Sequence, residues 1–432
     1  MVASPPDGPS KATRWGDPLK LLPLLALFAL SALAQAKGDM DADGWRYLIN
    51  ARNLMHGYMA SPATLMFWNG PGYPIFIFPW VALGLPLALA RLANAVCLYL
   101  AAVHCQGTLR ILGVEKRSLL YTYLIAGVLF LHGSLLGSIM SESLSVFLMC
   151  GGAWHYCRGS DGGAGGGRTQ AILAGLYLGW LALTKVFFGY ALEASLAAAL
   201  AAWPLFRRSR ETLAAARTAA LACAVGLLVC VPWLAHTWAK TGKIHYWGNS
   251  GGFQAWYMSW PEKEYHGDWL NWQAILEHEE YFRPHLDELH TVLKLDAVTQ
   301  DSVLKVWSRA NCKAHPRRCL ENWRANVNRM VFGYPITAYA GGGSELATGN
   351  RSFIYALPFF LLAAAAVPGW LGRRRIPPAA HACLVFTLIS LGGTSLLSAI
   401  PRQVFPVLPL VLIWCIVVAE KAVRIEGRWG RP

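Results

Sequence analysis

Three aspartates stand at alternate positions after the first apolar run of the chain, and carboxylates at this spacing can bind a metal ion or act as bases. They lie in the segment KGDMDADGWRYLIN as Asp39, Asp41 and Asp43. The pattern D-x-D-x-D-G matches the opening of an EF-hand calcium loop. The match then fails, because Asn50 stands where that loop needs a bidentate glutamate, and Arg46 would bring a cation into the cage. A role as a base is the better interpretation.

Other charged residues flank or interrupt the apolar stretches of the chain. An ionisable side chain at the centre of a membrane-spanning helix costs about 2.5–3.5 kcal/mol, so each calls for a reason. Five of them are predicted to reach the same outer face of the membrane: Asp43, Arg91, Glu142, Lys185 and Arg402. Carboxylates and cations together suit a reaction in which a base removes a proton while an anionic leaving group, such as a phosphate carried on a lipid, is neutralised. For Arg91 and Arg402, a charged end that simply extends to the membrane surface is an equal alternative.

The composition places the chain among polytopic membrane proteins. Of its 432 residues, 55% are hydrophobic and only 14% are charged, whereas soluble domains carry about 25% charged residues. Backbone groups inside lipid must be paired within the protein, which favours helices as the spanning elements. The net charge of +14 comes from short basic clusters between apolar runs, where Lys and Arg set orientation. No nucleic acid partner is therefore expected.

Apolar runs predict about ten transmembrane helices, each needing roughly 20 residues. They are expected near residues 20–36, 88–110, 118–138, 143–157, 169–184, 188–205, 214–237, 352–371, 379–399 and 403–420. The basic breaks between these runs all fall on the side of the N-terminus, which the positive-inside rule assigns to the cytoplasm. We therefore expect an all-α membrane protein with its polar segments outside.

The predicted topology divides the chain into four parts. They are a cytoplasmic tail, 1–19; an N-terminal transmembrane module, 20–237, with a catalytic outer loop, 37–80; an extracytoplasmic loop domain, 238–351; and C-terminal transmembrane helices with a basic tail, 352–432. Interfacial helices are expected in the outer loop, and a small, mostly helical fold in the outer domain. Seven tryptophans of that domain, from Trp247 to Trp323, suit interfacial anchors, a folded core or stacking platforms for sugar rings.

Most of the ten cysteines stand singly in apolar runs, where cysteine behaves as a small hydrophobic residue. Cys312 and Cys319 are different, because they lie together in the polar segment NCKAHPRRC. No metal-binding pattern surrounds them. A local disulfide and two free thiols are the alternatives, and the disulfide is preferred outside the cytoplasm.

Several short segments carry a resemblance to a known family. In chain order they are DADGWRYLINARNLMHG followed by GPGYPIF, then RLANAV, MSESLSVFL, LGWLALTK, VPWLAHTWAKTGKIHYWGNSGGFQAWY and PRQVFPVLPLVL. In this order the sequence resembles the GT-C superfamily of membrane glycosyltransferases, in its protein-mannosyltransferase and aminoarabinose-transferase-like branch. It departs from the pattern at His236 and Thr237, where many relatives have Arg-Asn. The outer domain from Glu262 to Leu346 matches no pattern that we can name.

The resemblance implies roles for the residues that match it. Asp43 would be the general base, with Asp41 as second choice, and Glu142 would orient the acceptor or hold the loops. The implied donor-phosphate ligands are Lys185, Arg402 and Arg91, and the implied substrate contacts are Tyr47, Tyr73 and Asn249. A divalent cation is compatible with the aspartates, but we expect no obligatory metal cofactor.

The resemblance also implies the reaction. A sugar would pass with inversion from an undecaprenyl- or dolichyl-type phosphate to a glycan, lipid or protein acceptor on the non-cytoplasmic face of a bacterial inner membrane, or of the endoplasmic reticulum in a eukaryote. The alternatives are a polytopic transporter, for which the chain lacks inverted repeats, and a ligase acting on lipid-diphosphate glycans. The sugar, the acceptor and the host are not encoded in any motif.

Overall fold

The computed structural model describes residues 16–34, 42–60, 64–131, 138–161, 167–205, 209–261, 286–333, 345–397 and 401–423, with the backbone alone for 42, 205 and 345–352. Throughout these ranges the regular structure is helical, with no strand. The all-α prediction is therefore confirmed for the part of the chain that the structure describes. Asp39, Asp41, Trp269 and Trp272 lie outside it.

Ten helices form a bundle, and each falls on one of the ten apolar runs. They are α1 (Pro18–Ala34), α4 (Leu87–Ile111), α5 (Ser118–Leu131), α6 (Glu142–Ser160), α7 (Gly167–Thr184), α8 (Phe187–Leu205), α9 (Arg210–Thr241), α16 (Glu345–Leu371), α17 (Pro378–Ser395) and α19 (Leu408–Lys421). Four of these helices, α4, α9, α16 and α17, contain a segment that is long and apolar enough to cross a membrane. The chain is thus an integral membrane protein, while the number ten stays a prediction.

Small residues let the bundle helices approach closely, as is usual between helices in lipid. On α7, Gly175 and Gly179 lie one turn apart against α9. A Cβ added at Gly175 would come 2.6 Å from the carbonyl oxygen of Ala222, and one at Gly179 would come 2.8 Å from that of Gly226. Glycine is therefore required at these crossings.

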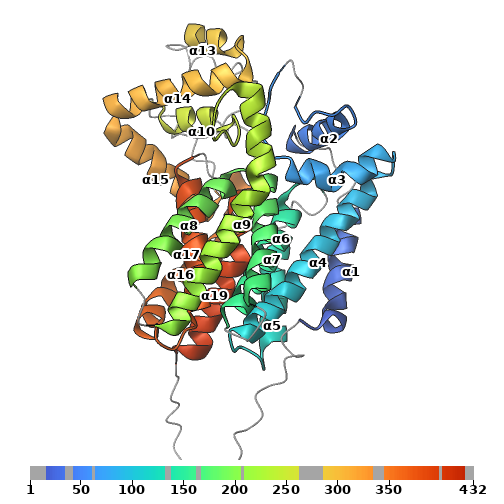
Figure 1. Cartoon of the computed structure of the whole chain (residues 1–432), viewed down its shortest axis with the longest axis vertical. Helices are drawn as coiled ribbons and strands as arrows, with labels where there is room; N and C mark the ends of the chain where they lie inside the picture. Colours follow the sequence, from blue (N-terminus) through green and yellow to red (C-terminus); the bar gives the residue numbers. More distant parts are fainter. Residues whose placement is uncertain are drawn as a thin grey trace, which may run out of the picture.

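At one end of the bundle lie the basic residues Arg110, Lys116 and Arg117, in and beside the connector between α4 and α5, and Lys421 at the end of α19. There the start of α5 meets the end of α19, and Arg117 lies 3.2 Å from the carboxylate of Glu420. The opposite end carries two short helices of the first polar segment, α2 (Ala42–Leu54) and α3 (Gly72–Ala82), at the upper right of Figure 1. Helical segments expected in the outer loop are thus present.

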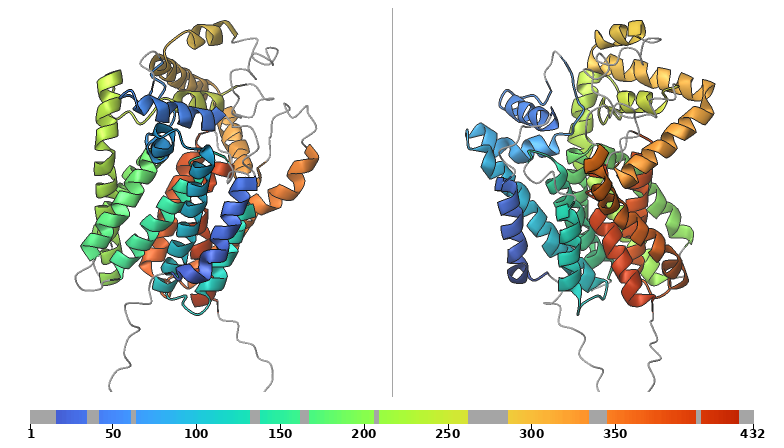
Figure 2. Two further views of the ribbon diagram at one scale, coloured as in Figure 1. Left: turned by 90° about the vertical axis from the view of Figure 1, so that its right-hand side faces the viewer. Right: turned by 180° about the vertical axis from the view of Figure 1, so that it is seen from behind.

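A separate group of helices covers the same end of the bundle, above it in Figures 1 and 2. We call it the cap, and it consists of α10 (Gly251–Met258), α13 (Leu286–Leu293), α14 (Ala297–Ala314) and α15 (Pro316–Phe332). Helix α9 continues to Thr241 and α16 begins at Glu345, so both bundle helices extend past the predicted limits of the outer domain.

The tryptophans of the cap form its core. Trp256 and Trp260 are at most 2% exposed and pack edge to face, with ring centroids 4.7 Å apart, beside Phe253 and Leu304. Trp247 is equally buried against the bundle. Of the three predicted uses, the folded core is therefore the one these three residues serve. Trp323 is more open, at 38% exposed.

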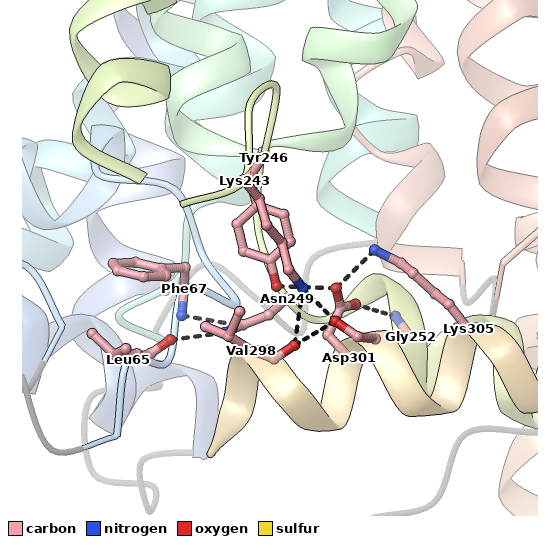
Figure 3. A network of polar contacts seen from close by, with 10 residues as sticks. Leu65, Phe67, Lys243, Tyr246, Asn249, Gly252, Val298, Asp301 and Lys305 are labelled. Atoms are coloured by element: carbon pink, nitrogen blue, oxygen red, sulfur yellow. Dashed lines mark hydrogen bonds and ion pairs between the residues drawn. The ribbon is translucent and has the colours of Figure 1, made fainter. Parts of the chain in front are cut away.

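One buried carboxylate ties the cap together, as Figure 3 shows. Asp301, on α14, is 1% exposed and accepts hydrogen bonds from Tyr246 Oη at 3.0 Å, the Gly252 backbone N–H at 2.7 Å and Lys305 Nζ at 2.8 Å. Lys243 donates to the Val298 carbonyl at 3.2 Å. These bonds anchor the loop after α9 and the start of α10 on α14.

Helix α15 joins the cap to the C-terminal part of the bundle. Asn326 Nδ2 donates to the carbonyl oxygens of Ser395, at 2.8 Å, and Leu397. Trp323 Nε1 donates to Ser395 Oγ at 3.1 Å. The same helix packs against α18 (Pro401–Val404), the short helix that carries Arg402.

Cys312 and Cys319 lie at the turn between α14 and α15 and are free thiols in the structure. Burial and the neighbouring Cys312 raise the pKa of the Cys319 thiol to about 12. The two thiols therefore interact without a disulfide bond in the structure, and the disulfide stays a prediction.

Candidate active site

Asp43 is held by two arginines at the cap end of the bundle. It lies in the first turn of α2, and its side chain is 20% exposed. Arg402 Nη2 donates to Oδ2, and Arg46 Nη1 lies 3.0 Å from Oδ1. The first partner is 359 positions away in the chain, and the second is one helical turn away on α2. The fold thus places a base candidate beside a cation from each end of the sequence.

The two arginines decide the charge of this carboxyl. Burial raises the pKa of Asp43, but Arg402 and Arg46 outweigh it and hold the pKa below the ordinary value of 3.8. Lys185 acts in the same direction. Asp43 is therefore ionised near neutral pH, as a general base must be.

Glu142 and Lys185 form a second ion pair beside the first. Glu142 is the first residue of α6 and is 1% exposed, and its Oε1 lies 2.9 Å from Lys185 Nζ. Burial lowers the pKa of Arg402, but Asp43 and Glu142 outweigh this and raise it. Since Lys185 acts on Asp43 and Glu142 acts on Arg402, the two pairs are one electrostatic cluster. The predicted meeting of Asp43, Glu142, Lys185 and Arg402 is found in the structure.

Tyr47 and Tyr73 lie beneath this cluster, inside the protein. Tyr47 Oη donates to Ser141 Oγ at 2.9 Å, and its ring packs edge to face on Tyr73, with centroids 4.8 Å apart. Asn94 Nδ2 donates to Tyr73 Oη at 3.0 Å. The two tyrosines are 5% and 0% exposed. Both side chains fix α2 and α3 on the bundle, and their contact with a substrate stays a prediction.

Asn249 likewise makes its hydrogen bonds within the protein. It is fully buried; its Nδ2 donates to the Leu65 carbonyl at 2.7 Å, and its Oδ1 accepts the Phe67 backbone N–H at 2.9 Å (Figure 3). Both ends of the amide are thus used to hold the loop between α2 and α3. Asn249 therefore positions that loop, and its contact with a substrate stays a prediction.

The structure assigns no role to two other predicted site residues, Arg91 and Asp41. Arg91 lies in the second turn of α4 and is half-buried, and its role at a phosphate stays a prediction. Asp41 lies outside the described residues, so its part as an alternative base is not located. Within the described ranges, no cluster of three or more His, Cys, Asp or Glu side chains could hold a metal ion.

The sequence interpretation missed two charged residues. Arg46 follows Asp43 by three positions, a spacing that puts both on one helix face, and this signal was available. Glu193 interrupts the apolar run of α8 and binds His245 Nε2 at 2.6 Å and Trp247 Nε1 at 3.3 Å. No local pattern in the sequence predicts the contacts of Glu193, because the loop after α9 brings His245 and Trp247 to it from a distant part of the chain.

The turn Gly70-Pro71-Gly72 presses against the end of α7 and so fixes the position of Lys185. A Cβ at Gly72 would come 2.5 Å from Thr184 Oγ1 and 2.7 Å from its backbone nitrogen. A Cβ at Gly70 would collide with the carbonyl oxygen of Leu183. Both glycines are needed for this close approach.

No family model matches the sequence, and no curated protein matches it. Among solved structures, the archaeal oligosaccharyltransferase AglB from Archaeoglobus fulgidus, in complex with an inhibitory peptide and a dolichol-phosphate, is similar with a TM-score of 0.51 and 13% identity, over 93% of this chain and 50% of that chain. The same enzyme tethered to an acceptor peptide is similar with a TM-score of 0.51 and 13% identity, over 93% of this chain and 49% of that chain. ArnT from Cupriavidus metallidurans bound to undecaprenyl phosphate superposes more loosely, with a TM-score of 0.43 and 15% identity, over 92% of this chain and 77% of that chain.

The AglB comparison shows the fold of this chain. The alignment with this oligosaccharyltransferase covers 93% of this chain. The chain spans about half the length of AglB.

The close contact at Gly72 generates a test of the packing. Replacing Gly72 with alanine should force the end of α7 to shift, and overpacking of this kind costs about 1–3 kcal/mol. We expect a lower midpoint of thermal unfolding for the purified protein in detergent. Gly127→Ala, on α5 with open space around it, is the matched control and should unfold as the unchanged protein does. Equal midpoints for the two variants would contradict the packing argument.

Proposed function

We propose that the chain transfers a sugar from a polyprenyl-phosphate donor to an acceptor at the cap end of its helix bundle. The observation that carries the proposal is the cluster of Asp43 with Arg402, Arg46 and the Glu142–Lys185 pair. It offers an ionised base and three cations in one place. The fold shared with AglB, which was crystallised with a dolichol-phosphate, supports a lipid phosphate as the donor.

The proposed reaction uses these groups in one displacement. An acceptor hydroxyl or amine attacks the anomeric carbon of the donor sugar as the bond from that carbon to the phosphate oxygen breaks. The leaving electron pair stays on the lipid phosphate, whose charge Lys185 and Arg402 neutralise. The acceptor proton passes to Asp43. Attack opposite the leaving group inverts the anomeric centre.

Asp43 can accept this proton while it stays in its ion pairs. A carboxylate has about four lone-pair sites on its two oxygens, and the arginines occupy one on each oxygen. The remaining sites are open to an acceptor hydroxyl. Glu142 keeps Lys185 in place and so acts through that lysine.

The cap is proposed to face the acceptor from the non-cytoplasmic side of the membrane. The basic connectors at the opposite end of the bundle support this orientation by the positive-inside rule. The acceptor class stays open among glycans, lipids and proteins, because this chain spans only half of AglB. A trial with undecaprenyl phosphates carrying mannose, glucose, galactose or arabinose would identify the donor.

Asp43→Asn tests the base. Asparagine keeps the size of the side chain but loses the charge that takes the proton, so turnover of the best donor should fall by at least about 10²-fold. Donor binding, measured with the same lipid in the absence of acceptor, should persist. Asp287→Asn, an exposed carboxylate on α13, is the control and should retain turnover. Undiminished turnover in Asp43→Asn would remove this residue from the chemistry.

Lys185→Ala tests the phosphate contact. Removing the ammonium takes away a charge-assisted interaction worth about 1.5–3 kcal/mol, so undecaprenyl phosphate should bind about 10- to 100-fold more weakly. Lys294→Ala, an exposed lysine after α13, is the control. The same affinity in Lys185→Ala and the unchanged protein would rule out this role.

The electrostatics of Asp43 predict a pH dependence. Because its pKa lies below 3.8, the base stays ionised as the pH falls, and kcat/KM should show no acid limb from Asp43 between pH 8 and pH 5. Arg402→Gln removes the main opposing charge and leaves burial, which raises the pKa of Asp43. The acid limb should then move to higher pH. Arg52→Gln, exposed on the same helix, should leave the profile unchanged, and an unmoved limb in Arg402→Gln would contradict the assignment.

A further inference from the structure

Two buried polar atoms at the cluster have no hydrogen-bond partner among the described residues. They are Asn69 Nδ2, an N–H donor, and Glu142 Oε2, an acceptor. A buried polar group without a partner is costly, and buried polar groups in native proteins are nearly always paired. A ligand that bonds to both atoms would remove this cost.

The two side chains share one arrangement. Asn69 Oδ1 accepts a hydrogen bond from Arg46 Nη1 at 3.3 Å, and Glu142 Oε1 binds Lys185 Nζ at 2.9 Å. Because arginine can only donate, its contact fixes which end of the Asn69 amide is oxygen and leaves the NH₂ as the unpaired end. Each residue thus holds a cation with one atom and leaves the other atom without a partner.

The loop that carries Asn69 is held from both sides. Asn249 fixes it at Leu65 and Phe67, and Gly70 packs directly on the end of α7. Leu65 adopts φ +44°, in the left-handed region, a conformation that persists only where the surroundings impose it. The Asn69 amide is therefore fixed in position before any ligand binds, as a specific site requires.

The chemistry of the two atoms indicates a hydroxyl-bearing ligand. A hydroxyl group both donates and accepts, so neighbouring hydroxyls can bond to an N–H donor and a carboxylate oxygen. A phosphate is excluded at Glu142 Oε2, because two negative charges would meet. In a sugar phosphate the hydroxyls lie next to the phosphate, just as these two atoms lie next to the cations.

We propose that Asn69 Nδ2 and Glu142 Oε2 recognise hydroxyl groups of the sugar carried on the lipid phosphate, and that Asn69 is a specificity-determining residue. This inference rests on the proposed function, since it needs the phosphate to lie at Lys185 and Arg402. Asn69 discriminates among sugars by the position of one hydroxyl. A site built to bond a hydroxyl rejects an analogue that lacks it.

The test compares the binding of two lipids, undecaprenyl phosphate and the best undecaprenyl-phosphate sugar of the four-sugar panel. Asn69→Ala should weaken the sugar-bearing lipid about 5- to 10-fold, the value of one hydrogen bond, and change the affinity for undecaprenyl phosphate about twofold at most. Asn69→Asp keeps an oxygen for Arg46 but loses the N–H donor. It should lower the ratio of the two affinities in the same way.

Asn53→Ala is the matched control, because its amide is used on the Met59 carbonyl at 3.1 Å, within the same outer segment. Its ratio of affinities should equal that of the unchanged protein. Equal weakening of both lipids in the Asn69 variants would show a merely structural role and overturn the inference, as would an unchanged ratio. If the unchanged protein binds neither lipid, the proposed function fails instead.

Discussion

The ion pair between Asp43 and Arg402 is the interaction on which the site depends. It joins the first turn of α2 to the short helix α18, 359 positions later in the chain. Helix α2 alone does not bring Asp43 to Arg402, and helix α18 alone does not bring Arg402 to Asp43. Tyr47 fixes α2 on the bundle through Ser141, and α15 holds α18 from the cap. Two separate packing arrangements must therefore both form before these charges can meet.

The charges of the cluster explain why it would bind an anion. Among the described residues of the cluster, Arg46, Lys185 and Arg402 contribute three positive charges and Asp43 and Glu142 contribute two negative charges, which leaves one positive charge over. Partly buried charges lose hydration, and the attraction between partners only offsets that loss when the geometry is good. An unbalanced cation next to a membrane surface is thus a strained arrangement in the free protein, and a lipid phosphate would balance it.

Much of this arrangement was predictable from the sequence, for identifiable reasons. Charges that break apolar runs are costly, so Asp43, Glu142, Lys185 and Arg402 could be singled out, and the alternation of spans put them at one end. The sequence could not predict which cation pairs with which carboxylate, because pairing depends on helix rotation and tilt. The sequence also could not show that Tyr47, Tyr73 and Asn249 are buried and hydrogen-bonded within the protein, because motif position does not reveal that a side chain points inward. Asn69 escaped notice because only the three-dimensional contacts show an amide with one end unused.

The most direct test of the central claim is a cryo-electron microscopy structure of the full chain with undecaprenyl phosphate bound. The account predicts density for the phosphate in contact with Lys185 and Arg402 and beside the Asp43 carboxylate, with the isoprenoid tail leaving towards lipid. Phosphate density at another place on the protein, with no ligand beside Lys185, Arg402 or Asp43, would contradict it.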